Sequence, residues 1–540
     1  MWKLKETVSQ LSLKLEISKF KMKILRKVYD FFAMPFKEDF IFLFVMALLV
    51  CGPRFYFHLF MQYQGVNMLV WEVAHSFLLC YFVSLPFQLI PARFKTLYKW
   101  FFYILAFVDF CIDTSCIIVT QNPFYIDHVA IVMGTNLSEG KDFISTYITS
   151  GLLLIIGATI VVIFLFLKYE KIINYIGRKL ALLLTVVSVS SCVYFVAKGS
   201  NTWECKFYNK ILSLMLFETP PDLRPYQTAL DIRIAESDMP DNIVLILGES
   251  FSKSHSSMYG YEKETNPCLT AMAHDSLLIS YSNVVAPATH TIDCVKSIMS
   301  TYKLEYKDSV NWYECTTLPN IMKHCGYTTY WISNQSPSGV FDNIATRYSE
   351  LCDSVYFVGN TMKGLGKSDF DEEVIAPLRQ GIVGDSKNFI IVQLMGSHLD
   401  YKNRYPDKWD VFQENDYPNL KDYKKNTIAS YDNSILYNDY VVSEILNCFE
   451  STETIALYFS DHGQDLFVSS EDYFGHARAG NSLSELAAIQ IPFFVYMSRK
   501  YQEKFPKETE WLKSRRGVSF NTEDTIVFVA ELFGLNSLDY

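Results

Sequence analysis

Acidic and histidine side chains follow apolar runs at three places in the C-terminal half of the chain. Glu249 ends "LILGE", Asp461 and His462 end "LYFSDH", and His398 follows "IIVQLMGS". Carboxylate oxygens and imidazole nitrogens bind divalent cations, and this mixture of ligands suits Zn²⁺. Each motif alone has an ordinary alternative, since Ser250 could cap a following helix and an Asp-His pair could form a solvated turn. Together the three motifs predict a metal site.

A hydroxyl group that could attack a substrate lies in the segment "APATHTIDCVKSIMS". Thr289 and Thr291 come just before a helical pattern that we expect to begin near Ile292. A threonine at a helix N-terminus is commonly only a cap. The same helix end also stabilises an anion, and a neighbouring divalent cation would make the hydroxyl a better nucleophile. The segment therefore supplies a candidate nucleophile.

Short apolar runs in this half of the chain alternate with helical patterns and predict the strands that position these groups. Continuous apolar runs are typical of strands buried on both faces, and their alternation with helices predicts a mainly parallel sheet sandwiched by helices. Because parallel strands end at one edge of a sheet, the polar strand ends can converge there. The expected strands are Ile243–Leu247, Leu278–Val285, Thr328–Ile332, Ser354–Phe357, Phe389–Leu394, Thr454–Phe459 and Phe493–Tyr496.

The N-terminal part of the chain contains long apolar segments that approach the ~20 residues needed to cross a bilayer. Lys and Arg are concentrated before the first segment, after the second and after the fourth, which places these stretches in the cytoplasm and the C-terminal half outside it. Polar residues inside the segments, such as Asp113, should face other helices or water. The five expected spans are Phe40–Leu59, Met68–Ile90, Leu97–Val119, Tyr147–Leu167 and Lys179–Ala197.

These patterns predict a division of the chain into four parts. Residues 1–37 form a cytoplasmic segment, which we expect to be an amphipathic helix on the inner membrane surface. Residues 38–198 form a five-helix transmembrane domain, 199–239 a connector, and 240–540 the catalytic domain. The net charge of −10 argues against a protein that binds nucleic acid, because phosphate binding requires a basic surface.

Several motifs resemble those of the bacterial inner-membrane phosphoethanolamine transferases, which modify lipid A and the lipopolysaccharide core and belong to the alkaline phosphatase and sulfatase superfamily. These motifs are "GESFSKSHSSMYGY", "THTI", "GSHLDYKNRYP", "YDNSILYNDYV", "SDHGQ" and "FGHARAG". The resemblance covers nearly the whole chain. It implies five membrane-spanning helices followed by a periplasmic α/β sulfatase-like domain, in a multi-pass protein of the bacterial inner membrane.

The resemblance also implies an activity and a metal site. Phosphoethanolamine would move from phosphatidylethanolamine to lipid A or the lipopolysaccharide core through a phospho-threonine intermediate. The nucleophile falls on Thr291, and the metal ligands fall on Thr291, Glu249, Asp461 and His462. The implied cofactor is one tightly bound Zn²⁺, with a second divalent metal left open. We expect a monomer without a nucleic-acid partner.

Further site residues follow from the same resemblance. His398 and His476 correspond to histidines that act in catalysis and bind the substrate phosphate or a second metal. The loop "MGTNLSEGKDF" resembles one that helps to hold the lipid donor, which makes Thr135, Asn136 and Glu139 weaker candidates for substrate binding. Ordinary capping of the loop would explain these three residues as well.

Some features depart from the familiar lipid A enzymes and leave the acceptor open. Pro287 and Ser297 stand where those enzymes have cysteines around the nucleophile, and "MYGY" and "THTI" are closer to the core-modifying branch. A related glycerol-phosphate transferase, or a sulfatase-like hydrolase acting on another envelope glycan, is an alternative, as is a catalytically inactive sensor or scaffold. The motifs "YDNSILYND" and "KNRYP" favour the ethanolamine branch, and no C/S-x-P-x-R sulfatase signature surrounds Thr291.

Overall fold

The computed structural model divides the chain into two compact units, which are described separately below. The candidate loop residues Thr135, Asn136 and Glu139, and most of the fifth expected span, lie outside the described residues. The structure describes residues 2–37, 39–57, 77–120, 124, 150–168, 183–184, 186, 221–227, 233–234, 239–307, 309–335, 337, 344–358, 370–382, 387–471, 473–477 and 481–536.

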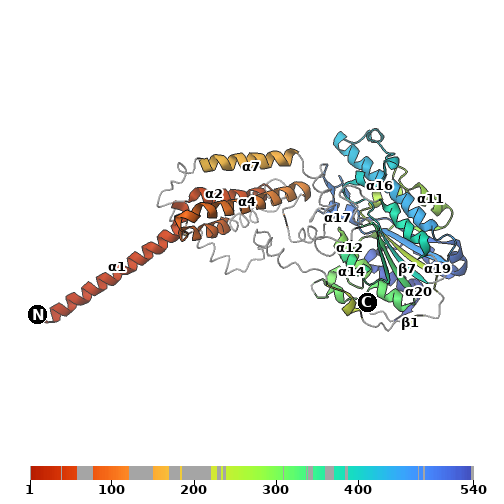
Figure 1. The fold of residues 1–540 in the computed structure, drawn as a ribbon, viewed down its shortest axis with the longest axis horizontal. Helices are drawn as coiled ribbons and strands as arrows, with labels where there is room; N and C mark the ends of the chain where they lie inside the picture. The colour runs from red at the N-terminus through yellow and green to blue at the C-terminus, as the bar shows by residue number, and fades with distance from the viewer. Residues whose placement is uncertain are drawn as a thin grey trace. The chain divides into compact units, whose positions relative to one another are not determined.

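Long helices make up the N-terminal unit (Figure 1). They are α1 (Trp2–Lys37), α2 (Phe40–Tyr56), α4 (Ala92–Thr120) and α7 (Ser150–Lys168), together with a helical segment at 77–84. Apolar side chains join these helices, as where the ring of Phe42 on α2 packs 5.2 Å from that of Tyr103 on α4. Asp113 faces another helix, as predicted, and accepts a hydrogen bond from Arg54 Nε at 2.9 Å in a buried ion pair.

Among the described residues, two helices of this unit are long and apolar enough to cross a membrane by length and composition, namely the parts of α4 and α7 at Ala92–Ile118 and Gly151–Lys168. They correspond to the third and fourth expected spans. The first expected span corresponds to α2, which is a shorter apolar helix of 17 residues. The predicted number of five spans stays a prediction.

A seven-stranded sheet forms the centre of the C-terminal unit, with the strand order β3-β11-β8-β2-β7-β5-β6. Strands β8, β2, β7, β5 and β6 are parallel to one another, whereas β11 is antiparallel to both β8 and β3. The mainly parallel sheet is therefore confirmed. The strands are β2 (Asn242–Gly248), β3 (Leu278–Ser280), β5 (Thr328–Ser333), β6 (Ser354–Phe357), β7 (Asn388–Gln393), β8 (Thr454–Ser460) and β11 (Phe493–Met497).

One expected strand is wrong in its extent. The run Leu278–Val285 forms two strands, β3 and β4 (Val284–Val285), because the chain leaves the sheet between them. Tyr281 lies buried at this point and donates a hydrogen bond to the carbonyl of Leu512. β4 then pairs with β12 (Phe520–Asn521) in a separate two-stranded sheet. The other short strands are β1 (Arg233–Ile234), β9 (Asp465–Leu466), β10 (Phe474–Gly475) and β13 (Leu535–Asn536).

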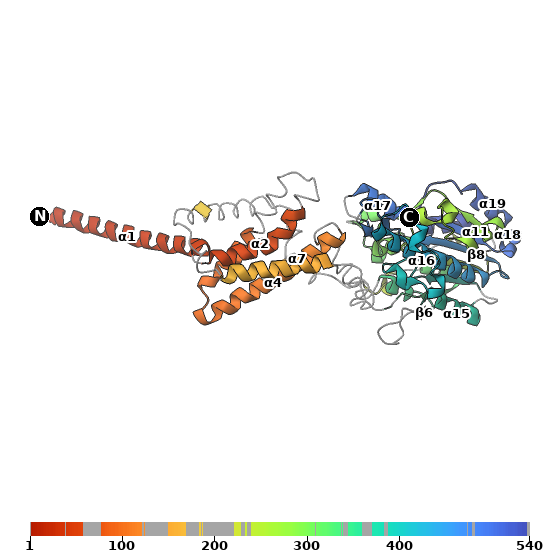
Figure 2. The same cartoon turned by 90° about the horizontal axis from the view of Figure 1, so that it is seen from above.

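Helices cover both faces of the sheet (Figure 1, and Figure 2 from above). Alternate residues of a strand point to opposite faces, so Leu245 of β2 joins a core with α12, α13, α14 and α20, whereas Tyr458 of β8 bonds to Asn438 of α16 on the other face. The helices are α11 (Pro267–His274), α12 (Thr291–Met299), α13 (Leu318–His324), α14 (Ile344–Ser349), α15 (Ile375–Pro377), α16 (Asp422–Asn447), α17 (Ser482–Ile489), α18 (Arg499–Lys504), α19 (Pro506–Ser514) and α20 (Thr525–Phe533).

Candidate active site

Two of the three polar strand ends, those after β2 and β8, meet at one edge of the sheet. Strand β2 lies between β8 and β7 and is parallel to both, with Gly248 opposite Ser460. Glu249 directly follows β2, and Asp461 and His462 directly follow β8, so the backbone carries these three side chains to the same place. The predicted convergence is confirmed for these residues.

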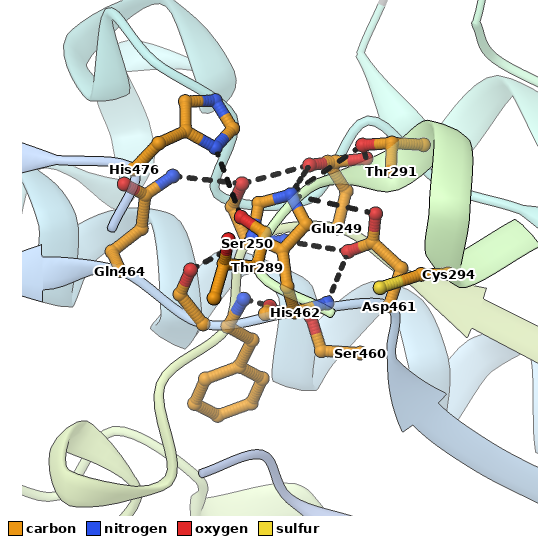
Figure 3. Close-up of polar contacts among 12 residues, drawn as sticks. Glu249, Ser250, Thr289, Thr291, Cys294, Ser460, Asp461, His462, Gln464 and His476 are labelled. Carbon is orange, nitrogen blue, oxygen red and sulfur yellow. Dashed lines mark hydrogen bonds and ion pairs between the residues drawn. The ribbon is translucent and has the colours of Figure 1, made fainter. Parts of the chain in front are cut away.

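Glu249, Asp461 and His462 could together hold a metal ion. One potential ligand atom from each lies within 4.8 Å of the other two, and the side chains are almost fully buried, with exposed fractions of 2%, 3% and 0% (Figure 3). His462 Nε2 lies 3.4 Å from Glu249 Oε1 and 3.6 Å from Asp461 Oδ2. Two carboxylates and an imidazole form a donor set that suits Zn²⁺.

Hydrogen bonding within the cluster leaves acceptors that a cation would satisfy. Asp461 Oδ1 accepts from the backbone N–H groups of Ser250 and His462, but Asp461 Oδ2 is buried without a hydrogen-bond partner among the described residues. His462 Nδ1 lies 2.8 Å from the carbonyl of Gly463, which can only accept, so Nδ1 carries the proton and Nε2 keeps a free lone pair. A buried acceptor without a partner is unfavourable, and a metal ion would provide one. The residues present therefore fit Zn²⁺.

The electrostatics of the cluster also favour a bound cation. Burial and the neighbouring Asp461 carboxylate raise the pKa of Glu249 well above its usual value, although hydrogen bonds from Ser250 and Thr291 oppose this shift. Two buried carboxylates so close together repel each other when both are ionised. A divalent cation between them would remove that repulsion and keep both in the ionised form that binds metal.

Thr291 is the first residue of α12, one position before the predicted start of this helix. Its Oγ1 lies 3.2 Å from Glu249 Oε2 and 3.4 Å from His462 Nε2, so the hydroxyl points at the candidate metal ligands rather than at a backbone N–H (Figure 3). The N-terminus of α12 also favours negative charge at this position. A hydroxyl held here can become a nucleophile.

His476 lies beside the cluster. It directly follows β10, which pairs with β9 just after the "SDHG" motif, and this brings its ring to 4.9 Å from that of His462. Its Nδ1 lies 3.5 Å from the carbonyl oxygen of Thr289. Burial, with smaller contributions from His462 and His290, lowers the pKa of His476 to about 3. His476 is therefore neutral at physiological pH.

His398 belongs to the loop that follows β7. Burial and the nearby Arg404 guanidinium hold the pKa of His398 well below its usual range, and His476 and His462 contribute in the same direction. Its Nδ1 is buried without a hydrogen-bond partner in the structure. A neutral imidazole with an unpaired nitrogen can hydrogen-bond to a polar group of a substrate.

The alternative that Ser250 caps a helix is wrong. Ser250 has a left-handed backbone conformation, with φ of 58°, and no α-helix begins after it. The tertiary structure directs its hydroxyl to Glu249 Oε1, at 2.7 Å, instead of to a backbone N–H. The sequence thus placed Ser250 correctly beside the site but did not reveal this contact.

Sequence reasoning also missed residues that support the cluster. Gln335 Nε2 lies 3.3 Å from Glu249 Oε2, and the amide N–H of Gln464 donates to Ser250 Oγ at 2.8 Å. Gln335 follows β5, the neighbour of β7, so its position after an expected strand was a usable signal. Gln464 lies within the "SDHGQ" motif itself.

The same regions of the chain match known proteins. Residues 241–533 match the sulfatase family. A curated relative, phosphoethanolamine transferase EptC from Escherichia coli O18:K1:H7, is 31% identical over 276 residues, which are 50% of this chain and 47% of the relative. The chain therefore spans about half the length of the curated relatives it matches.

Several solved structures are similar to the chain, including the following two. One is the C-terminal periplasmic domain of EcEptC from Escherichia coli in complex with Zn, with 26% identity and a TM-score of 0.51 over 57% of this chain and 85% of that one. The other is the integral membrane protein lipooligosaccharide phosphoethanolamine transferase A (EptA) from Neisseria meningitidis. It has a TM-score of 0.64 over 92% of this chain and 96% of that one, and at 16% identity this likeness concerns the fold alone.

The family match covers more than half of the 540 residues and contains the four residues that converge at the sheet edge, Glu249, Thr291, Asp461 and His462. The topology of the sheet, the residues at the strand ends and the sequence similarity all indicate the same family. The chain belongs to the sulfatase family.

Proposed function

We propose that this chain is a membrane-anchored, zinc-dependent transferase that moves phosphoethanolamine from phosphatidylethanolamine to lipid A or the lipopolysaccharide core. The observation that carries the proposal is the position of Thr291 Oγ1, 3.2 Å from Glu249 Oε2 and 3.4 Å from His462 Nε2. A hydrolase of this superfamily would need only water as acceptor, but similarity to EptC favours transfer of phosphoethanolamine.

Glu249, Asp461, His462 and Thr291 would hold the Zn²⁺ in this proposal. When bound, the ion would lower the pKa of the Thr291 hydroxyl and balance the charge of the two buried carboxylates. Support comes from the unpaired Asp461 Oδ2 and from the zinc complex of the similar EcEptC domain. Binding of a second divalent metal ion stays an open prediction.

The first half of the reaction forms a covalent enzyme. The Thr291 oxygen loses its proton and attacks the phosphorus of phosphatidylethanolamine, and the bond from phosphorus to the diacylglycerol oxygen breaks. Diacylglycerol leaves after gaining a proton, and phosphoethanolamine remains on Thr291. The N-terminus of α12 stabilises negative charge that develops at this position.

The second half regenerates the threonine. An acceptor hydroxyl or phosphate oxygen forms a new bond to phosphorus while the Thr291–phosphorus bond breaks and Thr291 regains a proton. His398 and His476 are neutral because burial lowers their pKa values, so either can hydrogen-bond to phosphate oxygens through its ring N–H. Their catalytic roles, and donor binding by Thr135, Asn136 and Glu139, stay predictions.

Membrane anchoring suits substrates that are themselves lipids. α4 and α7 have the length and composition of membrane spans, and the fold similarity to full-length EptA extends over 92% of the chain. We infer an inner-membrane protein with five spans, a cytoplasmic N-terminus and a periplasmic catalytic domain, acting as a monomer. Tethering raises the effective concentration of donor and acceptor at the site.

Replacing Thr291 tests this function. The purified 540-residue chain, incubated with phosphatidylethanolamine alone, should release diacylglycerol once per enzyme and gain the mass of one phosphoethanolamine on Thr291. Thr291→Ala should show neither change and should lose transfer to lipid A by at least ~1,000-fold, as expected when a nucleophile is removed. Thr270→Ala on α11, whose hydroxyl donates to the backbone carbonyl of Asn266 in its own helix turn, is the matched control.

Mass spectrometry of the lipid products separates the alternatives. A modified lipid A or core fragment supports the transferase, whereas free phosphoethanolamine without a modified acceptor indicates a hydrolase. Activity with phosphatidylglycerol but not phosphatidylethanolamine indicates the glycerol-phosphate branch. Full activity of Thr291→Ala would contradict the proposed mechanism, and wild-type protein inactive toward every donor would support a scaffold.

A further inference from the structure

Both oxygens of the Glu249 carboxylate are held by side chains that are not candidate metal ligands. Oε1 accepts a hydrogen bond from Ser250 Oγ at 2.7 Å, and Oε2 accepts one from Gln335 Nε2 at 3.3 Å. All three side chains are buried. The carboxylate of a buried glutamate that is bonded on both sides cannot rotate freely about its last torsion.

The bond from Ser250 has a fixed direction. Gln464 Nε2 donates to Ser250 Oγ at 2.8 Å, so the serine oxygen already acts as an acceptor there (Figure 3). A serine hydroxyl has a single hydrogen, which is then available for Glu249 Oε1. The serine thus presents a donor, and not a lone pair, to the carboxylate.

The backbone of Ser250 is also fixed. Its φ of 58° lies in the left-handed region, which is uncommon for a residue other than glycine. The Tyr431 hydroxyl donates to the Ser250 carbonyl at 2.7 Å, and the Ser250 N–H donates to Asp461 Oδ1 at 3.2 Å. An unusual backbone conformation that is held from two sides at a site commonly serves a function.

A second chain of hydrogen bonds fixes Gln335. Its Nε2 donates to the Leu394 carbonyl at 3.0 Å, and its Oε1 accepts from Gln393 Nε2 at 2.8 Å. Gln393 Oε1 in turn accepts from Ser333 Oγ at 3.0 Å. Because a backbone carbonyl can only accept, the amide of Gln335 must turn its N–H groups toward Leu394 and Glu249.

We propose that Ser250 and Gln335 are positioning residues that hold the Glu249 carboxylate, one oxygen each, in the orientation in which it binds the metal. This inference rests on the proposed function, because it takes the zinc site as given. Both residues act through Glu249. Groups that orient a metal ligand in this way commonly change metal affinity ~10–100-fold when they are removed.

Zinc affinity of the full 540-residue chain tests the role of Gln335. Gln335→Met keeps the length of the side chain but removes its amide, so the zinc dissociation constant should rise ~10–100-fold, measured by competition with a chelating indicator at fixed pH. Gln502→Met is the matched control, because Gln502 Nε2 also donates to two backbone carbonyls, those of Ser276 and Met497, far along the chain from the site. The control should bind zinc like the wild type.

Two variants of Ser250 separate the hydroxyl from the backbone. Ser250→Ala and Ser250→Gly both remove the hydroxyl, but glycine adopts a left-handed φ without strain. Both should weaken zinc binding to a similar degree, while Ser250→Gly should unfold at a higher temperature than Ser250→Ala. Recovery of wild-type zinc affinity in Ser250→Gly would overturn the role of the hydroxyl.

The outcomes distinguish this inference from the function on which it rests. Wild-type protein that binds no zinc would contradict the metal site itself and the inference with it. Wild-type protein that binds zinc, with Gln335→Met and both Ser250 variants binding it equally well, would overturn only the positioning role. An equal loss of affinity in Gln502→Met would also overturn it, because the effect would then reflect general destabilisation.

Discussion

Gly396 brings the loop after β7 against the backbone of Glu249. Its φ is +50°, and a Cβ atom added here would lie 2.6 Å from the Glu249 carbonyl oxygen and 2.9 Å from its backbone nitrogen. The buried Asp371 carboxylate holds the same loop by accepting from the N–H groups of Met395 and Gly396, both at 2.8 Å. The loop that carries His398 is thus clamped to the strand end that carries a candidate metal ligand.

Gly396→Ala should displace Glu249. We expect loss of stability by ~1–3 kcal/mol from the strained φ and the backbone contact, together with at least ~10-fold weaker zinc binding. The matched control is Gly260→Ala, because Gly260 has φ of +95° but open space around the position of its Cβ. That control should lose stability and keep its zinc affinity, both measured by thermal unfolding and chelator competition. Normal zinc binding in Gly396→Ala would contradict the inference that the contact between Gly396 and the Glu249 backbone positions Glu249.

At the scale of elements, α16 explains the motif "YDNSILYND". All of these residues are buried in the helix, and their polar side chains fix other segments of the unit. Asp432 accepts hydrogen bonds from the side chains of His255, Tyr261 and Tyr417, at 2.7, 2.7 and 2.6 Å. The bonds from His255 and Tyr261 anchor the segment after Glu249, which includes "MYGY". The motif therefore supports the segment that directly follows a candidate metal ligand.

Asp439 of α16 caps another helix. Its two carboxylate oxygens accept from the backbone N–H groups of Cys268 and Leu269, in the first turn of α11, at 2.8 and 3.0 Å. Burial nevertheless raises the pKa of Asp439 from its ordinary 3.8 to about 6, since the two backbone bonds offset only part of the burial effect. The folded protein therefore binds a proton between these pH values that the unfolded chain releases.

This proton gives a pH dependence with a defined sign. An acid whose pKa is raised by folding makes the protein less stable as the pH rises from about 4 to about 6. Asp439→Asn should remove this contribution. Between pH 4 and pH 7, the free energy of unfolding should therefore become up to ~3 kcal/mol more favourable to folding in the variant relative to the wild type, as measured by thermal unfolding at both pH values. For Asp422→Asn, the change in unfolding free energy relative to the wild type between these pH values should be small and of opposite sign, because Lys425 lowers the pKa of that exposed residue. A constant difference between Asp439→Asn and wild type at all pH values would contradict the raised pKa.

At the scale of the whole molecule, the chain comprises two units with different chemistry. The candidate metal ligands all belong to the C-terminal unit, and the helices with the composition of membrane spans belong to the N-terminal unit. Among the residues that the structure describes, the ten cysteines are all free, so no disulfide contributes to the stability of either unit there. A metal ion bound by Glu249, Asp461 and His462 would add stability to the C-terminal unit.

Metal removal should destabilise the C-terminal unit. Free zinc at ~100 times its dissociation constant would stabilise the folded state by ~2.7 kcal/mol, so a chelator should lower the unfolding temperature and added zinc should restore it. Asp461→Asn, which leaves Oδ1 in place but weakens the ligand set, should unfold at the same temperature with and without chelator. An unfolding transition of the wild type that is insensitive to chelator and zinc would contradict a bound metal.

The sequence alone determined the main elements of the C-terminal unit. Six of the seven expected strands match observed strands closely, because runs such as Ile243–Leu247 are apolar throughout and end abruptly in polar residues. Strands that are buried on both faces have this pattern. The convergence of Glu249, Asp461 and His462 followed from the same reasoning, since neighbouring parallel strands share an edge.

Only the tertiary structure decided how these side chains are held. The contact between Gln335 and Glu249 joins residues 86 positions apart, and the bond between Gln464 and Ser250 joins residues 214 positions apart. The left-handed backbone of Ser250 and the break between β3 and β4 likewise depend on partners such as Tyr431 and Leu512 that are distant in sequence. Local patterns of apolar and polar residues fix where a strand ends, but the choice among many possible hydrogen-bond partners is made only when the whole sheet and its helices pack together.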